Sequence, residues 1–202
     1  GKKIVPTFID RIQDRDGNTI FKHDNRACAN CGPLMSWADQ PTPVVPDVRA
    51  QILDPRHAYQ MTSIMEGVVQ RGTGVKLRSL GHPMAGKTGT TNDSKDTWFI
   101  GFTPNLVVGS YVGFDKPRPL GNKETGSRVA APVVKSFFEK ALEGVDPVPF
   151  KVPDGIRRVQ INAETGTRAM PGDSRVIWEN FVAGTEPTTR PMIYNGAGME
   201  TY

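Results

Sequence analysis

One run near the middle of the chain, Ala85 to Asn92, carries the residue types best suited to chemistry. It reads Ala-Gly-Lys-Thr-Gly-Thr-Thr-Asn. Together with the residues from Gly81 onward, Lys87 and Thr88 complete the pattern G-x-x-x-x-G-K-S/T of phosphate-binding loops. On their own, Lys87, Thr88 and Gly89 form K-T-G, an element of some acyl-transfer enzymes that use a serine nucleophile. The flanking sequence must distinguish these two chemistries.

The flanks do not suit a phosphate-binding loop. Such a loop needs an apolar strand before it and a helix starting at the Lys-Thr pair, so that backbone N–H groups face the phosphates. The preceding stretch, 71–80, contains two glycines, two arginines and a lysine. The following stretch, 89–94, opens with a glycine, which costs about 1 kcal/mol in a helix, and with β-branched threonines. Residues 97–102 are then rich in strand formers, so the motif leads into a β-meander, and a P-loop NTPase is the less favoured alternative.

The K-T-G interpretation assigns a role to each residue of an edge strand lining a cleft. The chemistry would be acyl transfer from a peptide with a free terminal carboxylate. Lys87 would supply positive charge and help to move a proton, while the hydroxyls of Thr88 and Thr90 would bind the substrate carboxylate. Gly89 would let the acyl group approach the backbone. The N–H of Thr90 would stabilise the developing oxyanion, and the extended peptide would add to the sheet edge as another strand.

Beyond this motif, the chain resembles the C-terminal part of the transpeptidase domain of class A (bifunctional) penicillin-binding proteins. The similarity covers most of residues 1–190 and is far more specific than K-T-G alone. It includes the helix before the motif, the successive strands, the approach to a last helix and part of the tail. These segments are 58–74, 86–93, 98–101, 107–115, 124–126, 130–132 and 184–188.

The resemblance implies an α+β fold of the penicillin-binding transpeptidase type, similar to serine β-lactamases, with helices packed on an antiparallel sheet. Only its C-terminal portion is expected here. The implied activity is peptidoglycan D,D-transpeptidation, in which the terminal D-alanine of a stem peptide is released and the acyl group passes to an amine. Lys87 and Thr90 would be catalytic, and Thr88, Gly89 and Thr90 would bind substrate. No metal or cofactor is implied.

The resemblance also implies partners and a location. The partners would be peptidoglycan stem peptides, β-lactam antibiotics and the remainder of the transpeptidase domain. The family places this domain on the periplasmic side of the inner membrane, with a membrane anchor and a glycosyltransferase domain expected N-terminal to it. A serine β-lactamase-like hydrolase and a non-catalytic peptidoglycan-binding module are the alternatives that stay open.

Two motifs of the family are absent from the sequence. The nucleophile lies in S-x-x-K and a proton relay in S-x-N, both N-terminal to K-T-G. No serine in the chain is followed by Lys three residues later or by Asn two residues later. The chain also begins at Gly1 rather than at a methionine. We therefore expect a piece of a longer protein that is inactive alone, because a nucleophile and its base act as a unit.

The composition of the chain argues against some other classes of function. Lys and Arg outnumber Asp and Glu by 25 to 21 in 202 residues, which gives a net charge of +4. The basic residues form no dense run, so nucleic-acid binding is not supported. The sequence contains no apolar run long enough to cross a membrane.

Local patterns predict the elements that would position the motif. A strand over 3–12, an Asp-Gly turn and a return strand over 19–22 come first, followed by a loop or insertion at about 24–50. A helix opens at Asp54-Pro55 and runs to about Gly72, with Met61, Ile64, Met65 and Val68 as its core stripe. Strands over 84–91, 96–103 and 106–114 follow. A second helix over 131–142 should cover one face of their sheet with Val133, Val134, Phe137, Phe138, Ala141 and Leu142.

The last quarter of the chain reads as a separate extension. Prolines 147, 149 and 153 mark a linker, so we expect residues 1–145 to belong to the transpeptidase domain and 146–202 to form a Pro/Gly-rich extension. Late strands are predicted over 156–161 and 175–181, and the last dozen residues read as a loose tail.

Cys28 and Cys31 are the only cysteines of the chain. A zinc site would need four ligands and there is no second pair, while a thioredoxin-like site would need a βαβ setting. In the oxidising compartment that the resemblance implies, a local disulfide is the favoured interpretation, with two reduced thiols as the second.

Overall fold

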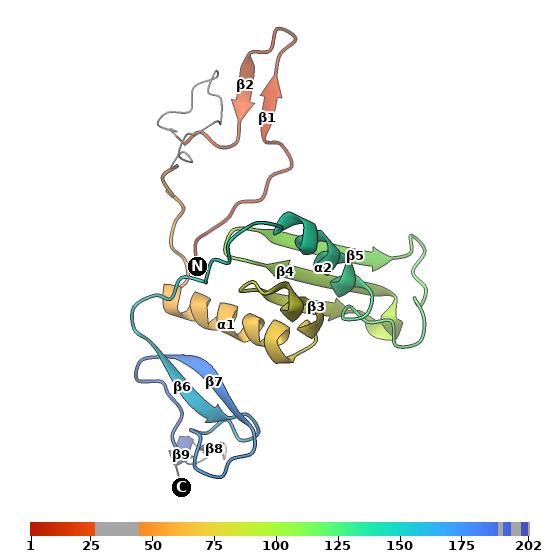
Figure 1. Cartoon of the computed structure of the whole chain (residues 1–202). Coiled ribbons are helices and arrows are strands. Elements are labelled where there is room, and N and C mark those ends of the chain that lie inside the picture. Colours follow the sequence, from red (N-terminus) through yellow and green to blue (C-terminus); the bar gives the residue numbers. More distant parts are fainter. Residues whose placement is uncertain (27–44, 190–191, 195–198, 202) are drawn as a thin grey trace. The chain divides into compact units, whose positions relative to one another are not determined.

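The computed structural model describes residues 1–26, 45–189, 192–194 and 199–201 (Figure 1). The chain forms two compact units, Gly1–Asp54 and Pro55–Tyr202. Each unit is described by itself below. The second unit contains the K-T-G motif.

The first unit contains a short antiparallel hairpin of β1 (Arg11–Gln13) and β2 (Thr19–Lys22). Its turn is closed by the carboxylate of Asp14, which accepts hydrogen bonds from the N–H groups of Asp16 at 2.9 Å and Asn18 at 2.8 Å. The return strand was predicted correctly. The strand predicted over 3–12 is wrong for most of its length, because a strand needs a partner and β2 offers only four residues to pair with.

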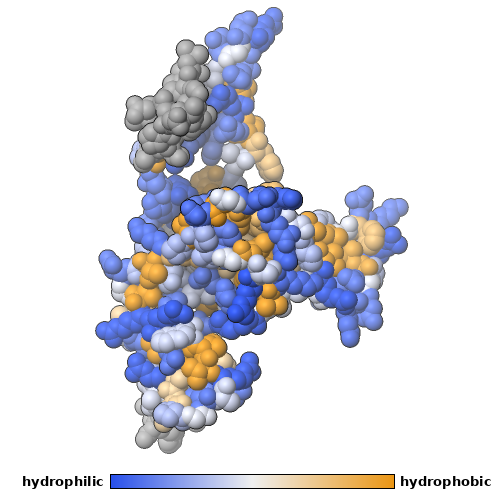
Figure 2. Space-filling model, in the orientation of Figure 1, coloured by the Kyte–Doolittle hydropathy of each residue, from blue (hydrophilic) through white to orange (hydrophobic). Residues whose placement is uncertain are grey.

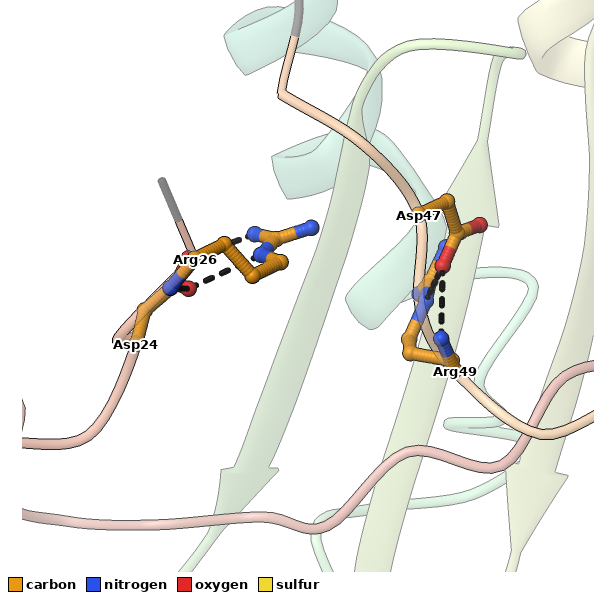
Figure 3. Close-up of polar contacts among 4 residues, drawn as sticks. All are labelled: Asp24, Arg26, Asp47 and Arg49. Atoms are coloured by element: carbon orange, nitrogen blue, oxygen red, sulfur yellow. Dashed lines mark hydrogen bonds and ion pairs between the residues drawn. The ribbon is translucent and has the colours of Figure 1, made fainter. Parts of the chain in front are cut away.

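Two Asp-x-Arg pairs hold the local backbone of the first unit (Figure 3). One lies before and one after residues 27–44, which the structure does not describe. Arg49 donates through both Nε and Nη2 to the carboxylate of Asp47, each at 2.8 Å, and Arg26 makes the same pairing with Asp24. The arginine hydrogen bonds hold the pKa of both carboxyls well below the usual value. Since these pairs are exposed, we expect them to order the local chain more than to add stability. Cys28 and Cys31 lie outside the described residues, so the disulfide remains a prediction.

The second unit has an antiparallel sheet with helices packed on it, which confirms the predicted fold class. The strands occur in the order β3-β4-β5, a meander as predicted. The elements are α1 (Pro55–Arg71), the 3-10 helix η1 (Val75–Leu80), β3 (Ala85–Thr90), η2 (Asn92–Ser94), β4 (Asp96–Phe102), β5 (Val107–Gly113) and α2 (Ala130–Ala141). Within the described residues, no helix has the length and apolar character needed to cross a membrane.

The core lies on one face of this sheet, where α1 packs on β3, and α2 packs on β4 and β5. Side chains alternate along β4, so Thr97 and Phe99 are fully buried while Trp98 and Ile100 are about half exposed. Phe99 fits because its neighbours lack side chains: a Cβ at Gly86 would lie 2.9 Å from its ring. The remaining core consists of Val69, Leu77, Met84, Ala130, Ala131, Val134 and Phe138.

The predicted apolar faces of both helices are only partly buried. Met61 and Ile64 of α1 are 53% and 56% exposed, so assigning them to the core was wrong. The buried positions of α1 are Ser63, Gly67 and Val69 instead. In α2, Val134 and Phe138 are buried, while Val133 and Phe137 remain exposed. Helical periodicity reveals an apolar side but does not show what covers it. Figure 2 shows hydrophobic residues reaching the surface over α2 and the neighbouring sheet.

A second antiparallel pair follows, made of β6 (Ile156–Asn162) and β7 (Val176–Val182), close to the predicted late strands. This pair packs against α1 through β7. A short pair, β8 (Met192–Tyr194) and β9 (Met199–Thr201), occupies the region that was predicted to be a loose tail. That prediction was wrong for these six residues, because a three-residue strand is too short to produce a recognisable alternation.

The alternating burial of the side chains of β4 leads to a prediction about stability, for which a neighbouring residue is the control. Phe99→Ala should lower the free energy of unfolding by about 3–5 kcal/mol, because it removes a fully buried ring from a packed core. Trp98→Ala, on the opposite face, should cost much less in this chain. Urea denaturation followed by circular dichroism measures both. Equal losses from the two substitutions would contradict the described orientation of β4.

Candidate functional site

The K-T-G motif lies on β3, which is an edge strand of the described sheet. A tight turn joins it to β4. The N–H of Thr91 donates to the carbonyl of Asp96 at 3.0 Å, and the N–H of Asp96 returns a bond to the Thr91 hydroxyl at 2.8 Å. Asp93 and Ser94 in this turn have positive φ angles of 62° and 51°, a conformation that non-glycine residues seldom adopt. The turn therefore fixes the end of β3 against β4.

The hydrogen bond from the N–H of Thr91 to the carbonyl of Asp96 also shows which peptide groups of β3 point away from β4. Antiparallel partners alternate between hydrogen-bonded and non-hydrogen-bonded pairs, and the register of β3 with β4 is unbroken. Since Thr91 and Asp96 form a hydrogen-bonded pair, so do Gly89 with Trp98 and Lys87 with Ile100. The N–H and C=O groups of Thr88 and Thr90 consequently point away from β4. An extended ligand could pair with them at the edge.

The side chain of Lys87 lies along this edge. Its cross-strand partner is Ile100, so Lys87 is on the face of the sheet opposite to Phe99. Its ammonium group donates a hydrogen bond to the carbonyl of Thr88 at 2.9 Å. The structure therefore brings the Lys87 cation next to an outward-pointing peptide group of the motif, in an exposed position.

The hydroxyls of Thr88 and Thr90 are held from the other face by residues that the sequence analysis did not single out. The hydroxyl oxygen of Thr88 lies 3.0 Å from that of Thr73, just after α1. Ser127 donates to the carbonyl of Thr73 at 2.7 Å, and the N–H of Gly126 donates to the hydroxyl of Thr90 at 3.1 Å. These residues fall in or beside segments that carry the resemblance, but no pattern in the sequence places them against K-T-G.

Gly126 approaches β3 so closely that only a glycine fits. A Cβ at this position would lie 2.4 Å from the carbonyl oxygen of Trp98 and 2.8 Å from that of Gly89. Backbone atoms cannot move aside as a flexible side chain can. The loop before α2 therefore rests directly on the backbone of the K-T-G strand.

A further contact supports the start of β4. The hydroxyl of Tyr111 on β5 donates to Asp96 at 2.7 Å, and the rings of Tyr111 and Trp98 lie 4.9 Å apart. The carboxylate of Asp96, as the acceptor of this bond, raises the pKa of the Tyr111 phenol. Asp96 thus anchors the turn after K-T-G through its backbone and β5 through its side chain.

The phosphate-binding interpretation fails on the same geometry. After Lys87 and Thr88 the chain continues as strand β3 to Thr90 and returns as the antiparallel strand β4. In this part of the structure no helix begins at the Lys-Thr pair, so the N–H groups that would hold phosphates are not gathered there. The P-loop alternative was wrong.

Across the described residues, no group of three or more His, Cys, Asp or Glu side chains is arranged to hold a metal ion.

Comparison with known proteins identifies the family of the chain. The family described as penicillin binding protein transpeptidase domain matches residues 1–139. The chain belongs to this family. A second family, described as penicillin-binding protein 1A, C-terminal domain, matches residues 152–194. The resemblance drawn from the sequence is therefore confirmed, and the structure neighbour described next agrees with the fold class.

Individual relatives show the extent of the similarity. Penicillin-binding protein 1A of Rickettsia typhi is 48% identical over 168 residues, which cover 82% of this chain and 21% of the relative. That of Neisseria gonorrhoeae is 36% identical over 202 residues, covering 99% of this chain and 23% of the relative. A crystal structure of penicillin-binding protein 1A from Haemophilus influenzae matches 96% of this chain and 31% of its own, with a TM-score of 0.69 and 28% identity. The chain thus spans about a fifth of the length of its curated relatives.

The position of Gly126 generates a prediction about the support of the motif strand. Gly126→Ala should lower the free energy of unfolding by about 1–3 kcal/mol, because the new methyl group collides with the backbone of β3 and β4. Gly109→Ala on β5 is the control, since its methyl group would be 3.7 Å from the nearest atom. Denaturant unfolding measures both effects. In NMR spectra, the amide signals of Gly89 and Thr90 should move in the first variant only, and their staying in place would contradict the described contact.

Proposed function

We propose that this chain supplies the K-T-G side of the D,D-transpeptidase centre of a bifunctional class A penicillin-binding protein. The observation that carries the proposal is the edge position of β3, with the peptide groups of Thr88 and Thr90 pointing outward. The reaction would release the terminal D-alanine of a peptidoglycan stem peptide and transfer the acyl group to an amine on another strand. Membership of the transpeptidase family supports this assignment.

Each motif residue has a part in this reaction. The extended stem peptide would pair with the outward peptide groups of β3. The Thr90 N–H would donate to the oxyanion as the tetrahedral intermediate forms, and Gly89 would let the acyl group come close. Lys87 would attract the peptide carboxylate and help to move a proton. The hydroxyls of Thr88 and Thr90, oriented by Thr73 and Gly126, would contact the carboxylate.

The nucleophile of this reaction would come from the remainder of the transpeptidase domain, because the chain has no S-x-x-K sequence. The chain alone should therefore be inactive, and β-lactams should acylate the serine on the other segment. In this proposal residues 1–145 belong to the transpeptidase domain and 146–202 form the extension. The whole protein would carry a membrane anchor and a glycosyltransferase domain, and would work on the periplasmic side of the inner membrane.

The open face of the sheet supports an interface with that remainder. Trp98, Ile100 and Tyr111 share one face of the sheet with Lys87 and are 46–50% exposed. Large apolar side chains gathered on one exposed face mark a binding surface more often than a solvated one. We infer that the remainder of the domain packs on this face and brings its nucleophile to the same side as Lys87.

Acylation by a reactive penicillin tests the proposed centre. When this chain is co-expressed with the preceding segment of its parent protein, intact mass should show one penicilloyl adduct on that segment. Lys87→Ala should slow acylation by roughly 10²–10⁴-fold, because it removes both a cation and a proton carrier. Lys76→Ala, an exposed lysine of η1, should change the rate little.

Four other results would overturn parts of the proposal. An adduct on this chain would reveal a nucleophile within it. A co-purified complex that forms no adduct would exclude the transpeptidase assignment. Rapid turnover of the penicillin in place of a stable adduct would favour the β-lactamase-like alternative, and reversible stem-peptide binding without turnover would favour a non-catalytic module.

The proposed interface generates its own prediction. Replacing both Trp98 and Ile100 by serine should weaken the association with the preceding segment by about tenfold or more, since buried aromatic residues dominate such interfaces. Met170→Ser is the control, because Met170 is also an exposed apolar residue but lies outside the sheet. Co-purification and interferometry measure the association. An unchanged dissociation constant in the double variant would place the interface elsewhere.

A further inference from the structure

A cleft of about 460 Å³ lies between α1 and the β6–β7 pair, away from the K-T-G edge. Its walls come from Tyr59, Glu66 and Gln70 on one side and from Arg158 and Trp178 on the other. None of these residues belongs to the K-T-G site. The volume is enough for a small organic molecule.

The two walls are joined by direct contacts that fix their spacing. The side-chain amide of Asn180 donates to the hydroxyl of Ser63 at 2.8 Å, and Gln60 donates to the carbonyl of Asn180 at 3.2 Å. Arg71 and Glu179 form an ion pair at the same junction. The cleft is thus a property of packed elements and does not depend on one loose side chain.

Two opposite charges in this cleft have no ionic partner among the described residues. Arg71 and Glu179 neutralise each other, but neither Glu66 nor Arg158 takes part in an ion pair. Glu66 is half buried, and this burial raises the pKa of its carboxyl group, with Arg158 acting in the opposite direction. A half-desolvated carboxylate without a donor gains from a cationic ligand.

Arg158 is oriented without being neutralised. Its guanidinium lies over the ring of Trp178 at 5.2 Å from the centroid, a cation–π contact that leaves its hydrogen-bond donors available. The side chain of Trp178 is 49% exposed and forms an apolar wall. Tyr59 adds a phenol, whose pKa is raised by burial and then by the charge of Glu66.

We propose that this cleft binds a small zwitterion of the α-amino acid type. The ammonium group of the ligand would face Glu66, its carboxylate would face Arg158, and its side chain would lie against Trp178. A ligand with one charge would leave the other wall unpaired, and a polyanion would be repelled by Glu66. This site is independent of the proposed transpeptidase centre and needs no nucleophile.

Titration of the ¹⁵N-labelled 202-residue chain with alanine tests the proposal by NMR. Alanine should cause saturable shifts in the amides of α1, β6 and β7 and in the indole N–H of Trp178. N-acetylalanine lacks the ammonium charge and alaninamide lacks the carboxylate. Each should bind about tenfold more weakly or worse, because each loses one charge-assisted contact. Shifts that do not saturate, or that are the same for all three ligands, would overturn the proposal.

Charge-neutral variants identify the residue that faces each group. Glu66→Gln should abolish the preference for alanine over N-acetylalanine. Arg158→Gln should abolish the preference for alanine over alaninamide. Glu143→Gln and Lys151→Gln, both exposed and outside the cleft, should keep both preferences. If the variants Glu66→Gln and Arg158→Gln keep both preferences while their spectra show an intact fold, the cleft is not the site.

The melting temperature of the Glu66→Gln variant tests independently whether the Glu66 carboxylate lacks a stabilising partner. A carboxyl group whose pKa is raised in the folded state stabilises the fold below its unfolded pKa, and this contribution is lost as the pH rises through the folded pKa. The variant should therefore melt at a higher temperature than the unmodified chain at pH 7, with a smaller difference at pH 4. A lower melting temperature at pH 7 would mean that Glu66 has a stabilising partner, which would contradict the proposed charge arrangement.

Discussion

The alternation of side chains along β4 is the constraint on which the second unit depends. One set of its residues faces the helices, and Phe99 fills the space left by glycines on the neighbouring strand and on β4 itself. The other set, with Trp98 and Ile100, faces away from the core. Because β3 pairs with β4 in an unbroken register, this alternation also decides on which face each K-T-G side chain lies. A shift by one residue would move Lys87 to the core side.

The motif strand is thus supported from one face and open on the other. Thr73 and Gly126 approach it from the side of the core and hold the two threonine hydroxyls, and Ser127 in turn donates to the carbonyl of Thr73. On the opposite face, Lys87 lies among exposed apolar side chains. This asymmetry fits the proposed function, in which the strand is rigid where its own domain holds it and accessible where the substrate and a second segment would approach.

The β6–β7 pair adds a second polar region with a different character. The ion pair of Arg71 with Glu179 and the amide of Asn180 connect the pair to α1. Glu66 and Arg158 are left with opposite charges across a cleft. A half-buried carboxylate without an ion pair costs folding free energy, so Glu66 is the reason for proposing a binding site here and not only a packing contact.

The sequence by itself determined the family and the main local elements around the K-T-G motif. The helix opening at Asp54-Pro55, the three-strand meander and the K-T-G motif all follow from short-range signals, namely a proline at the first helical position, β-branched and aromatic runs, and fixed spacings. The absence of S-x-x-K is likewise a fact of sequence.

Only the tertiary structure decided which residues meet. Met61 and Val69 are both apolar residues of α1, yet one is exposed and the other buried, because burial depends on what packs against the helix. Gly126 and Gly89 are far apart along the chain, and their contact depends on where the loop before α2 crosses the sheet. The placement of Glu66 and Arg158 in one cleft has the same origin, since periodicity describes one element at a time while a site is formed by several.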